Sequence, residues 1–309
     1  MRFTVAICTW NRADLLEQTL EQLAGLRIPP GVRWDLVVVN NACTDHTDRV
    51  LDRFSGRLPL HRVFESEPGL SNARNRAVAE AEGDWIVWTD DDVLVDPKWL
   101  VAYADAIDAH PGVSLLGGPV EPWFEGGAPA WLRRVFDQVS TAFAVRDLAD
   151  EPFRLAPDPG RLPFGANYAV RLDAQRRHLY DPELGRRPGS MVGSEETSVM
   201  LALLEEGAEG WWVPAAHVRH FIPSERQTVG YLRRFYEGQG EQSGRASTSD
   251  GRFMLANRPS WMWREAMAAE IGYRLQRTFL PPERWLPALK RTAFLRGRLR
   301  GAGHDRNDA

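Results

Sequence analysis

The sequence has 309 residues, of which 43% are hydrophobic and 26% are charged, with a formal net charge of −4. This composition is typical of a folded protein of one large domain or two smaller ones, and the acidic balance argues against a nucleic-acid partner. No apolar run reaches the ~18 residues of a membrane-spanning helix. Two cysteines, Cys8 and Cys43, are too few for a disulfide framework, and no leader precedes the first strand, so we expect a cytoplasmic protein.

The first hundred residues alternate between strand and helix patterns. Continuous apolar runs predict strands at 3–9, 34–40 and 84–90. Apolar residues at helical spacing predict helices at 12–26, 45–54, 70–83 and 97–110. This alternation predicts a parallel sheet covered on both faces, whose ligands bind at the carboxyl ends of the strands.

The pattern changes near residue 113. Strands and turns are expected at 113–124, 165–172 and 210–216, separated by loops rich in glycine and proline. A helix with an acidic first turn is expected at 193–207, and the chain is mostly helical from residue 226.

Three adjacent aspartates, Asp90, Asp91 and Asp92, follow the third apolar strand. On an extended segment the side chains of Asp90 and Asp92 point to the same face. Two carboxylates on one face suit a hard divalent cation, Mg²⁺ or Mn²⁺. The alternative is a strand-end turn in which the aspartates accept hydrogen bonds from backbone amides.

Five segments, taken together, resemble the bacterial family 2 glycosyltransferases. They are VAICTWNRADLLEQTLEQL, LVVVNNACTDHT, EPGLSNARNRAVAEAEGDWIVWTDDDV, PFGANYAV and GSEETSVMLALLEEG. The resemblance covers roughly residues 3–240, and the segments occur in the family order. It implies an inverting, metal-dependent enzyme. Single-sugar, non-processive addition is favoured because the spanning helices and the Q-x-x-R-W motif of processive relatives are absent.

The implied fold is the α/β GT-A fold, a Rossmann-like mixed central sheet covered by helices. The implied domain at 1–225 has a nucleotide-binding half at 1–112 and an acceptor-binding half at 113–225. A helical C-terminal extension follows at 226–309.

The resemblance also implies roles for single residues. Asp92 matches the last aspartate of the family's D-x-D motif and would bind the metal, with Asp90 and His220 as further candidate ligands. A lone histidine beside an apolar strand is equally compatible with a structural role. The expected donor-binding residues are Thr9, Asn11, Arg12, Asn40, Asn41, Asp45, Arg74, Asp90 and Asp91.

Asn40 departs from the family, which often has an aspartate there to read the nucleobase. An asparagine carbonyl can still accept a hydrogen bond from the uracil ring N–H, so a uridine donor is favoured. The alternative for Asn40 and Asn41 is a plain turn, and we expect it to hold for at least one of them. Of the two arginines in GLSNARNR, Arg74 is expected to be functional and Arg76 structural.

Glu195 and Glu196 match the family's acidic pair, and Glu196 is the expected catalytic base. Inverting transfer needs a carboxylate that takes the proton of the acceptor hydroxyl. The alternative is that acidic residues simply favour the first turn of a helix. Gly165 and Asn167, in the PFGAN segment, are the expected acceptor contacts.

The sequence therefore predicts transfer of a sugar from a nucleotide-sugar, with UDP favoured, to a hydroxyl group. The acceptor would be a glycan, a lipid-linked molecule or a small molecule, in glycan or glycoconjugate biosynthesis. The alternatives are a catalytically degenerate GT-A protein that binds nucleotide or acts as a scaffold, and a nucleotidyltransferase. A dehydrogenase is disfavoured because no G-x-G-x-x-G follows an early strand.

Residues 258–300 carry ten arginines and lysines against three acidic residues, with aromatic residues interleaved. Basic helices of this kind can bind an anionic membrane surface, which would make the protein peripheral on the inner face of the cytoplasmic membrane. A packed helix pair with a solvated basic face is the other reading.

Overall fold

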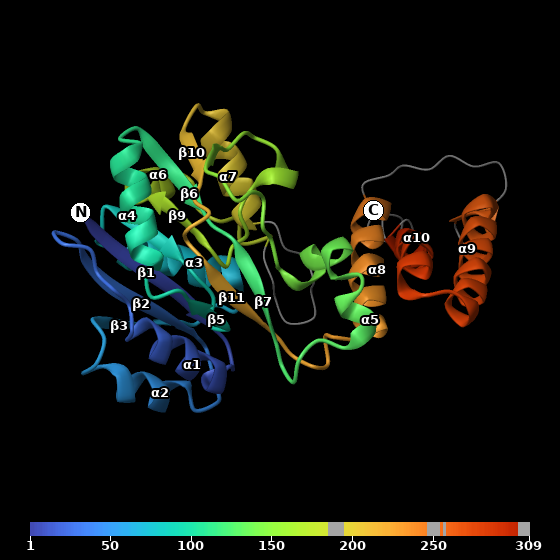
Figure 1. The fold of residues 1–309 in the computed structure, drawn as a ribbon, viewed down its shortest axis with the longest axis horizontal. Coiled ribbons are helices and arrows are strands. Elements are labelled where there is room, and N and C mark those ends of the chain that lie inside the picture. The colour runs from blue at the N-terminus through green and yellow to red at the C-terminus, as the bar shows by residue number, and fades with distance from the viewer. Residues whose placement is uncertain (185–194, 246–253, 256–257, 302–309) are drawn as a thin grey trace. The chain divides into compact units, whose positions relative to one another are not determined.

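The computed structural model describes residues 1–184, 195–245, 254–255 and 258–301. The chain divides into two compact units, the first made of Met1–Trp123 and Ala144–Phe221 and the second of Phe124–Phe143 and Ile222–Ala309 (Figure 1). The second unit thus includes 124–143, which the sequence analysis placed in the acceptor-binding half. The functional domain boundaries at 112 and 225 stay a prediction.

The first unit is built on an eight-stranded sheet in the order β3-β2-β1-β4-β9-β6-β10-β8. Strand β1 pairs in parallel with β2 and β4, whereas β9 is antiparallel to β4 and β6, so the sheet is mixed. In sheet order the strands span Leu60–Glu65, Arg33–Asn41, Arg2–Thr9, Trp85–Trp88, Tyr168–Arg171, Val113–Gly117, Glu209–Trp212 and Phe153–Arg154.

Helices cover both faces of this sheet, as Figure 1 shows. They are α1 (Ala13–Leu23), α2 (Thr47–Phe54), α4 (Trp99–Ala109), α3 (Leu70–Glu80), α6 (Leu172–Arg177) and α7 (Glu195–Glu205). Alternation along β2 explains the two faces: Leu36 and Val38 join a core with α1, α2 and α4, whereas Val37 and Val39 join a core with α3, α6 and α7.

A small second sheet lies next to the aspartates. It has the order β5-β11-β7, with strands Val93–Val95, Val218–Ile222 and Val120–Phe124. Strand β5 follows directly after Asp92, and its pairing with β11 sets His220 opposite Val93. The pairing therefore brings His220 close to Asp92 across more than a hundred residues of sequence.

The second unit is mainly helical. It contains α5 (Ala130–Arg133), 3₁₀ turns at Phe136–Gln138 and Ser140–Phe143, α8 (Val229–Arg245), strands β12 (Met254–Leu255) and β13 (Arg258–Pro259), α9 (Ser260–Phe279) and α10 (Pro282–Gly301). A third 3₁₀ turn, Pro159–Arg161, belongs to the first unit. Within the described ranges, no helix combines the length and the apolar character that a membrane crossing requires.

Helices α8 and α10 approach each other closely through two glycines. A Cβ atom on Gly240 would lie 2.0 Å from the backbone oxygen of Phe294, and one on Gly297 would lie 1.8 Å from that of Glu237. Neither distance is possible for a real side chain, so this helix crossing depends on glycine at both positions.

Most elements expected from the sequence are present within a few residues of their predicted ends. Several short elements were not identified from the sequence, among them α6, β5 and β8. The edge strand β3 was not identified either. Its residues are mostly exposed or half-buried, with only Val63 in the core, so it lacks the continuous apolar run of the central strands.

Candidate active site

The three aspartates do not lie on an extended segment. Strand β4 ends at Trp88, and Asp91 and Asp92 form a turn before β5. The prediction that Asp90 and Asp92 share one face is therefore wrong, because strand alternation does not apply in a turn. Instead Asp91 and Asp92 lie side by side, and Asp90 faces another group.

Arg12 neutralises the turn from the end of β1. Its Nη1 lies 3.1 Å from Asp91 Oδ1 and 2.7 Å from Asp92 Oδ2, and both carboxylates are buried. Adjacent carboxylates repel each other, and here an arginine of the same chain offsets part of that repulsion. Arg12 stays about one-third exposed, which leaves part of its guanidinium open to solvent.

Asp91 is held from two further sides. The Thr9 hydroxyl donates to its Oδ2 at 2.8 Å, and the Thr19 hydroxyl donates to its backbone oxygen at 3.0 Å. Burial raises the pKa of Asp91 to about 7, with Arg12 opposing that rise and Asp92 adding to it. Because Thr9 is buried and its hydroxyl is used here, it orients Asp91 instead of lining the donor site as expected.

Asp92 and His220 form a buried pair of possible metal donors. His220 Nε2 lies 3.5 Å from Asp92 Oδ1, and the buried Nδ1 of His220 has no hydrogen-bond partner in the described part of the chain. A carboxylate oxygen and an imidazole nitrogen both suit Mn²⁺, so the pair fits two positions around a cation. Among the described residues, however, no group of three or more His, Cys, Asp or Glu side chains is arranged to hold a metal.

A second charged cluster surrounds Arg74 on α3. Its Nη1 lies 2.7 Å from Glu195 Oε1 and 3.5 Å from Glu196 Oε2, and its Nη2 lies 3.9 Å from Asp90 Oδ1. Arg74 and Glu195 are buried, whereas the Glu196 side chain is 18% exposed. Burial raises the pKa of Glu195, an effect that Arg74 opposes and Glu196 reinforces. Arg76, as expected, is an exposed residue paired with Glu80.

Of the two expected acceptor contacts in the PFGAN segment, Gly165 lies at this cluster and Asn167 does not. A Cβ atom on Gly165 would lie 2.6 Å from Arg74 Nη2 and 3.2 Å from Glu196 Oε1, so the loop backbone borders the cluster. Asn167 is fully buried, and it bonds the Trp99 indole, the Tyr103 hydroxyl and the backbone oxygens of Pro119 and Ala216. The expectation that Asn167 contacts an acceptor is corrected: its polar atoms hold the core together.

The two asparagines at the end of β2 organise the neighbouring loops. Asn41, the last residue of β2, donates to the backbone oxygens of Glu65 and Glu67 and accepts from Gly69, so its side chain has a structural role, although it lies in a strand and not in the expected turn. Asn40 donates to Asp48 and accepts from the backbone of Cys43. Its carbonyl oxygen has a second lone pair and its amide has a second N–H, so both groups keep one position for a nucleobase.

Asn11 and Asp45 fasten this loop to the end of β1. Asn11 adopts a left-handed conformation, with φ of 53°, and its Oδ1 accepts from the backbone N–H groups of Thr44 and Asp45. Asp45 in turn accepts from the backbone N–H of Ala13, the first residue of α1, and from Thr47. Both residues shape the rim of the expected donor site.

Sequence reasoning missed two features of the site. Trp10, between Thr9 and Asn11, is 49% exposed, which is unusual for a tryptophan and leaves an aromatic face open at the carboxyl end of β1. Trp88 and Tyr180 place aromatic rings 5.8 Å and 5.4 Å from the Arg74 guanidinium carbon. The position of Trp10, directly after Thr9 at the end of a predicted strand, is the sequence signal that could have identified it.

Comparison with known proteins gives a consistent picture. Residues 4–144 match the family model described as glycosyl transferase family 2. The succinoglycan biosynthesis protein ExoM of Rhizobium meliloti is 25% identical over 77% of this chain and 74% of its own length. The validoxylamine A glucosyltransferase of Streptomyces hygroscopicus subsp. limoneus is 31% identical over 57% of this chain, which spans 38% of that enzyme.

Solved structures show the same fold at low sequence identity. The mannosyltransferase PcManGT of Pyrobaculum calidifontis, in complex with GDP-Man and Mn²⁺, matches with a TM-score of 0.61 and 18% identity over 99% of this chain and 88% of its own. Residues 1–349 of S. aureus TarS, in complex with UDP-GlcNAc, match with a TM-score of 0.53 and 18% identity over 91% of this chain and 74% of that one. The fold is therefore the GT-A fold expected from the sequence.

Proposed function

Because the chain is a member of glycosyl transferase family 2, we propose that it moves one sugar from a nucleotide-sugar to a hydroxyl group with inversion of configuration. A UDP-sugar is the favoured donor, and the acceptor is a glycan, a lipid-linked molecule or a small molecule. One observation carries the proposal: Asp90 and the Asp91–Asp92 turn lie beside an arginine–diglutamate cluster at the carboxyl ends of parallel strands. Ligands of open α/β sheets bind at that edge.

Glu196 is the proposed catalytic base. Arg74 holds the buried Glu195 at 2.7 Å, and Glu196 is the more exposed carboxylate of the two. The Glu196 carboxylate takes the proton of the acceptor hydroxyl as that oxygen forms its bond to the anomeric carbon. The bond from the anomeric carbon to the diphosphate oxygen breaks at the same time, and the nucleoside diphosphate leaves with the electron pair from the opposite face.

Asp92 and His220 are the proposed protein ligands of a divalent cation, with Asp90 facing the donor. When bound, Mg²⁺ or Mn²⁺ would supply positive charge to the diphosphate leaving group. Arg12, which lies 2.7 Å from Asp92, is placed to bind a phosphate with the part of its guanidinium that faces solvent.

The exposed ring of Trp10 and the carbonyl of Asn40 are the proposed contacts for the nucleobase. An exposed indole stacks on any base, whereas a carbonyl that accepts from a ring N–H favours uracil. Gly165 is the proposed floor of the acceptor site, because its backbone lies against Glu196. We further propose a cytoplasmic enzyme that works at the inner face of the membrane.

A thermal-shift panel tests the donor site. UDP-, GDP-, dTDP- and CMP-sugars are added with and without Mn²⁺ to the wild type, to Asp92→Ala and to the control Asp52→Ala, whose side chain is exposed on α2. A ligand that binds only the folded state raises its stability. We expect a Mn²⁺-dependent shift with one nucleotide class, lost in Asp92→Ala and kept in Asp52→Ala.

Two results would contradict the proposal. The absence of any nucleotide-dependent shift in the wild type would contradict the donor site and favour the degenerate protein. A product with the same anomeric configuration as the donor sugar, measured by nuclear magnetic resonance, would contradict inversion.

A further inference from the structure

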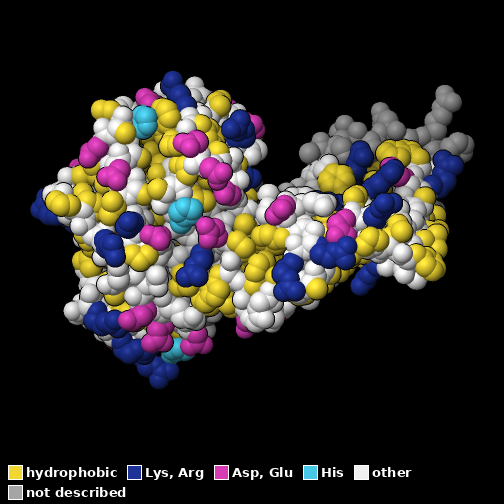
Figure 2. Space-filling model, viewed as in Figure 1, with side chains coloured by type: hydrophobic (Ala, Val, Ile, Leu, Met, Phe, Trp, Pro, Cys, Tyr) yellow, Lys and Arg dark blue, Asp and Glu magenta, His cyan; other side chains and the backbone are white. Residues whose placement is uncertain are grey.

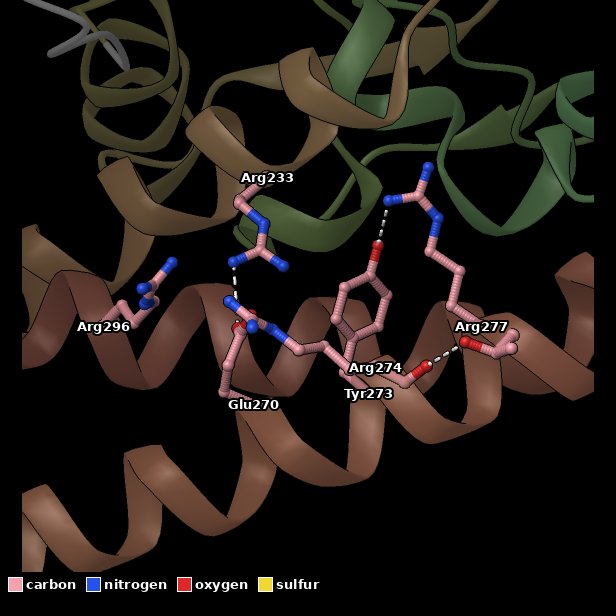
Figure 3. Close-up of a pocket in the computed structure, with 7 residues that line it drawn as sticks. Arg233, Glu270, Tyr273, Arg274, Arg277 and Arg296 are labelled. Atoms are coloured by element: carbon pink, nitrogen blue, oxygen red, sulfur yellow. Dashed lines mark hydrogen bonds and ion pairs between the residues drawn. The ribbon is translucent and has the colours of Figure 1, made fainter.

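A basic pocket lies within the second unit, between α8, α9 and α10 (Figure 3). Its volume is about 730 Å³, and it is lined by Arg233, Glu270, Tyr273, Arg274, Arg277, Thr278 and Arg296. Four arginines from three helices thus face one pocket, and Glu270 is the single carboxylate among the described residues that line it. None of these residues belongs to the site described above.

The single carboxylate does not neutralise the pocket. Glu270 binds Arg233 at 3.0 Å and Arg274 at 2.9 Å, so its charge is shared between two guanidinium groups. Arg277 donates to the neutral Tyr273 hydroxyl at 3.2 Å. Arg296 lies 4.0 Å from its nearest described carboxylate, Glu237. The pocket therefore has an excess of positive charge and of N–H donors, which is the chemistry that binds phosphate.

An apolar stripe runs along the same helix as the pocket. Met267, Ile271, Leu275 and Phe279 recur every four residues on α9 and are 58%, 61%, 58% and 79% exposed. They lie on the side of the helix away from the buried Tyr273. Figure 2 shows hydrophobic side chains along this part of the molecule with lysine and arginine side chains beside them.

Arg274 links the two features, because it lines the pocket and directly precedes Leu275 of the stripe. Its side chain is 74% exposed. A helix with an exposed apolar face flanked by arginines has the form of an interfacial membrane helix. A free phosphate would use the pocket and leave the stripe in water, whereas a lipid surface matches both.

We propose that α9 lies on an anionic lipid bilayer, with its apolar stripe among the acyl chains and a lipid phosphate in the arginine pocket. This deepens the proposed function, since it locates the enzyme at a lipid surface where a lipid-linked acceptor would be found. Its test requires no nucleotide-sugar, acceptor or turnover. Failure of vesicle binding would therefore remove the membrane location and leave the proposed sugar transfer standing.

Vesicle co-sedimentation of the full chain tests the proposal. One set of vesicles is phosphatidylcholine, and the other is phosphatidylcholine with an equal amount of phosphatidylglycerol. We expect binding to the second set that weakens with salt. Each basic residue near an anionic surface changes the partition by about fivefold, so Arg274→Ala/Arg277→Ala should lower it by roughly tenfold or more.

Two matched controls separate this surface from general effects. Arg53→Ala/Arg57→Ala removes the same charge from exposed positions in the first unit, and it should leave the partition within about twofold. Ile271→Ser/Leu275→Ser should abolish binding, whereas Phe64→Ser, at another exposed apolar position, should not. All variants change exposed side chains, and circular dichroism checks that each is folded.

Three results would overturn the proposal. The first is equal loss of binding in the two arginine pairs, which would indicate net charge alone. The second is an absence of vesicle binding while inorganic phosphate raises the melting temperature of the wild type but not of the pocket variant, which would indicate a soluble anion. The third is an absence of vesicle binding while Ile271→Ser/Leu275→Ser converts a dimer to a monomer, which would make the stripe an interface between copies.

Discussion

Arg74 and Glu195 form a buried ion pair, with 2.7 Å between Nη1 and Oε1, although 121 residues separate them in the chain. The pair joins α3, in the half expected to bind nucleotide, to the first residue of α7. Arg74 thus pairs with Glu195, the more buried of the two glutamates, and Glu196 is the more exposed one. The relationship thus distinguishes a positioning residue, Glu195, from the proposed base.

Removing Arg74 should destabilise the protein strongly. Arg74→Ala leaves the buried Glu195 without its partner, and breaking a buried pair in this way costs about 3–5 kcal/mol. Urea unfolding followed by circular dichroism measures the loss. The control is Arg76→Ala on the same helix, whose pair with Glu80 is exposed and should contribute less than about 1 kcal/mol. An equal loss of unfolding free energy in the two variants would contradict a larger contribution from the buried Arg74 pair.

Replacing the proposed base should reduce catalysis without affecting donor binding. Glu196→Gln keeps the shape of the side chain but cannot accept the proton, so kcat should fall by roughly 10²–10⁴-fold. The nucleotide-induced thermal shift should be unchanged. Glu205→Gln, an exposed change at the end of the same helix, serves as the control. A Glu196→Gln variant with full activity would exclude this residue as the base.

Two glycine substitutions in the second unit should have opposite effects on stability. Gly297→Ala sets a methyl group 1.8 Å from the backbone oxygen of Glu237, so α8 and α10 must separate. That overpacking should cost about 1–3 kcal/mol or more. Gly272→Ala on α9 meets nothing within 4 Å, and it should stabilise the helix by roughly 0.5–1 kcal/mol. Thermal unfolding of both variants tests the crossing, and destabilisation by Gly272→Ala would contradict the described α9.

Glu270 should make the second unit sensitive to acid. Burial acts to raise its pKa, but hydrogen bonds from Arg274, Arg233 and Thr292 outweigh burial and lower the pKa from 4.5 to about 2. A depressed carboxyl pKa gives stability that is present above pH 4.5 and is lost as the pH falls towards 2. Glu270→Gln should therefore be less stable than the wild type at neutral pH, by at most about 3 kcal/mol.

The difference in the free energy of unfolding between wild type and Glu270→Gln should shrink as the pH falls from about 4.5 towards about 2. Urea unfolding at a series of pH values measures it. Glu265→Gln, which removes a more exposed partner of Arg291, should change the free energy of unfolding at neutral pH by less than about 1 kcal/mol. A constant difference between wild type and Glu270→Gln at all pH values would contradict the ion-pair network.

The sequence by itself determined most of the secondary structure and the family of this protein. Buried strands such as 3–9 and 34–40 are continuous apolar runs, and helices such as 70–80 keep a regular period, so both are local signals. It also indicated which ends of the strands carry polar groups. Strand β3 was not predicted, because an edge strand with few buried residues has no continuous apolar run.

Only the tertiary structure decided what each polar residue does. Asn167 and Arg74 are both polar residues in matched motifs, yet one bonds four groups of the core and the other binds the acidic pair. The pairing of Arg12 with Asp91 and Asp92, and of His220 with Asp92, joins segments that are about 80 to 130 residues apart in the chain. A side chain's partners depend on how strands and helices pack in space, and the period of the local sequence carries no information on that.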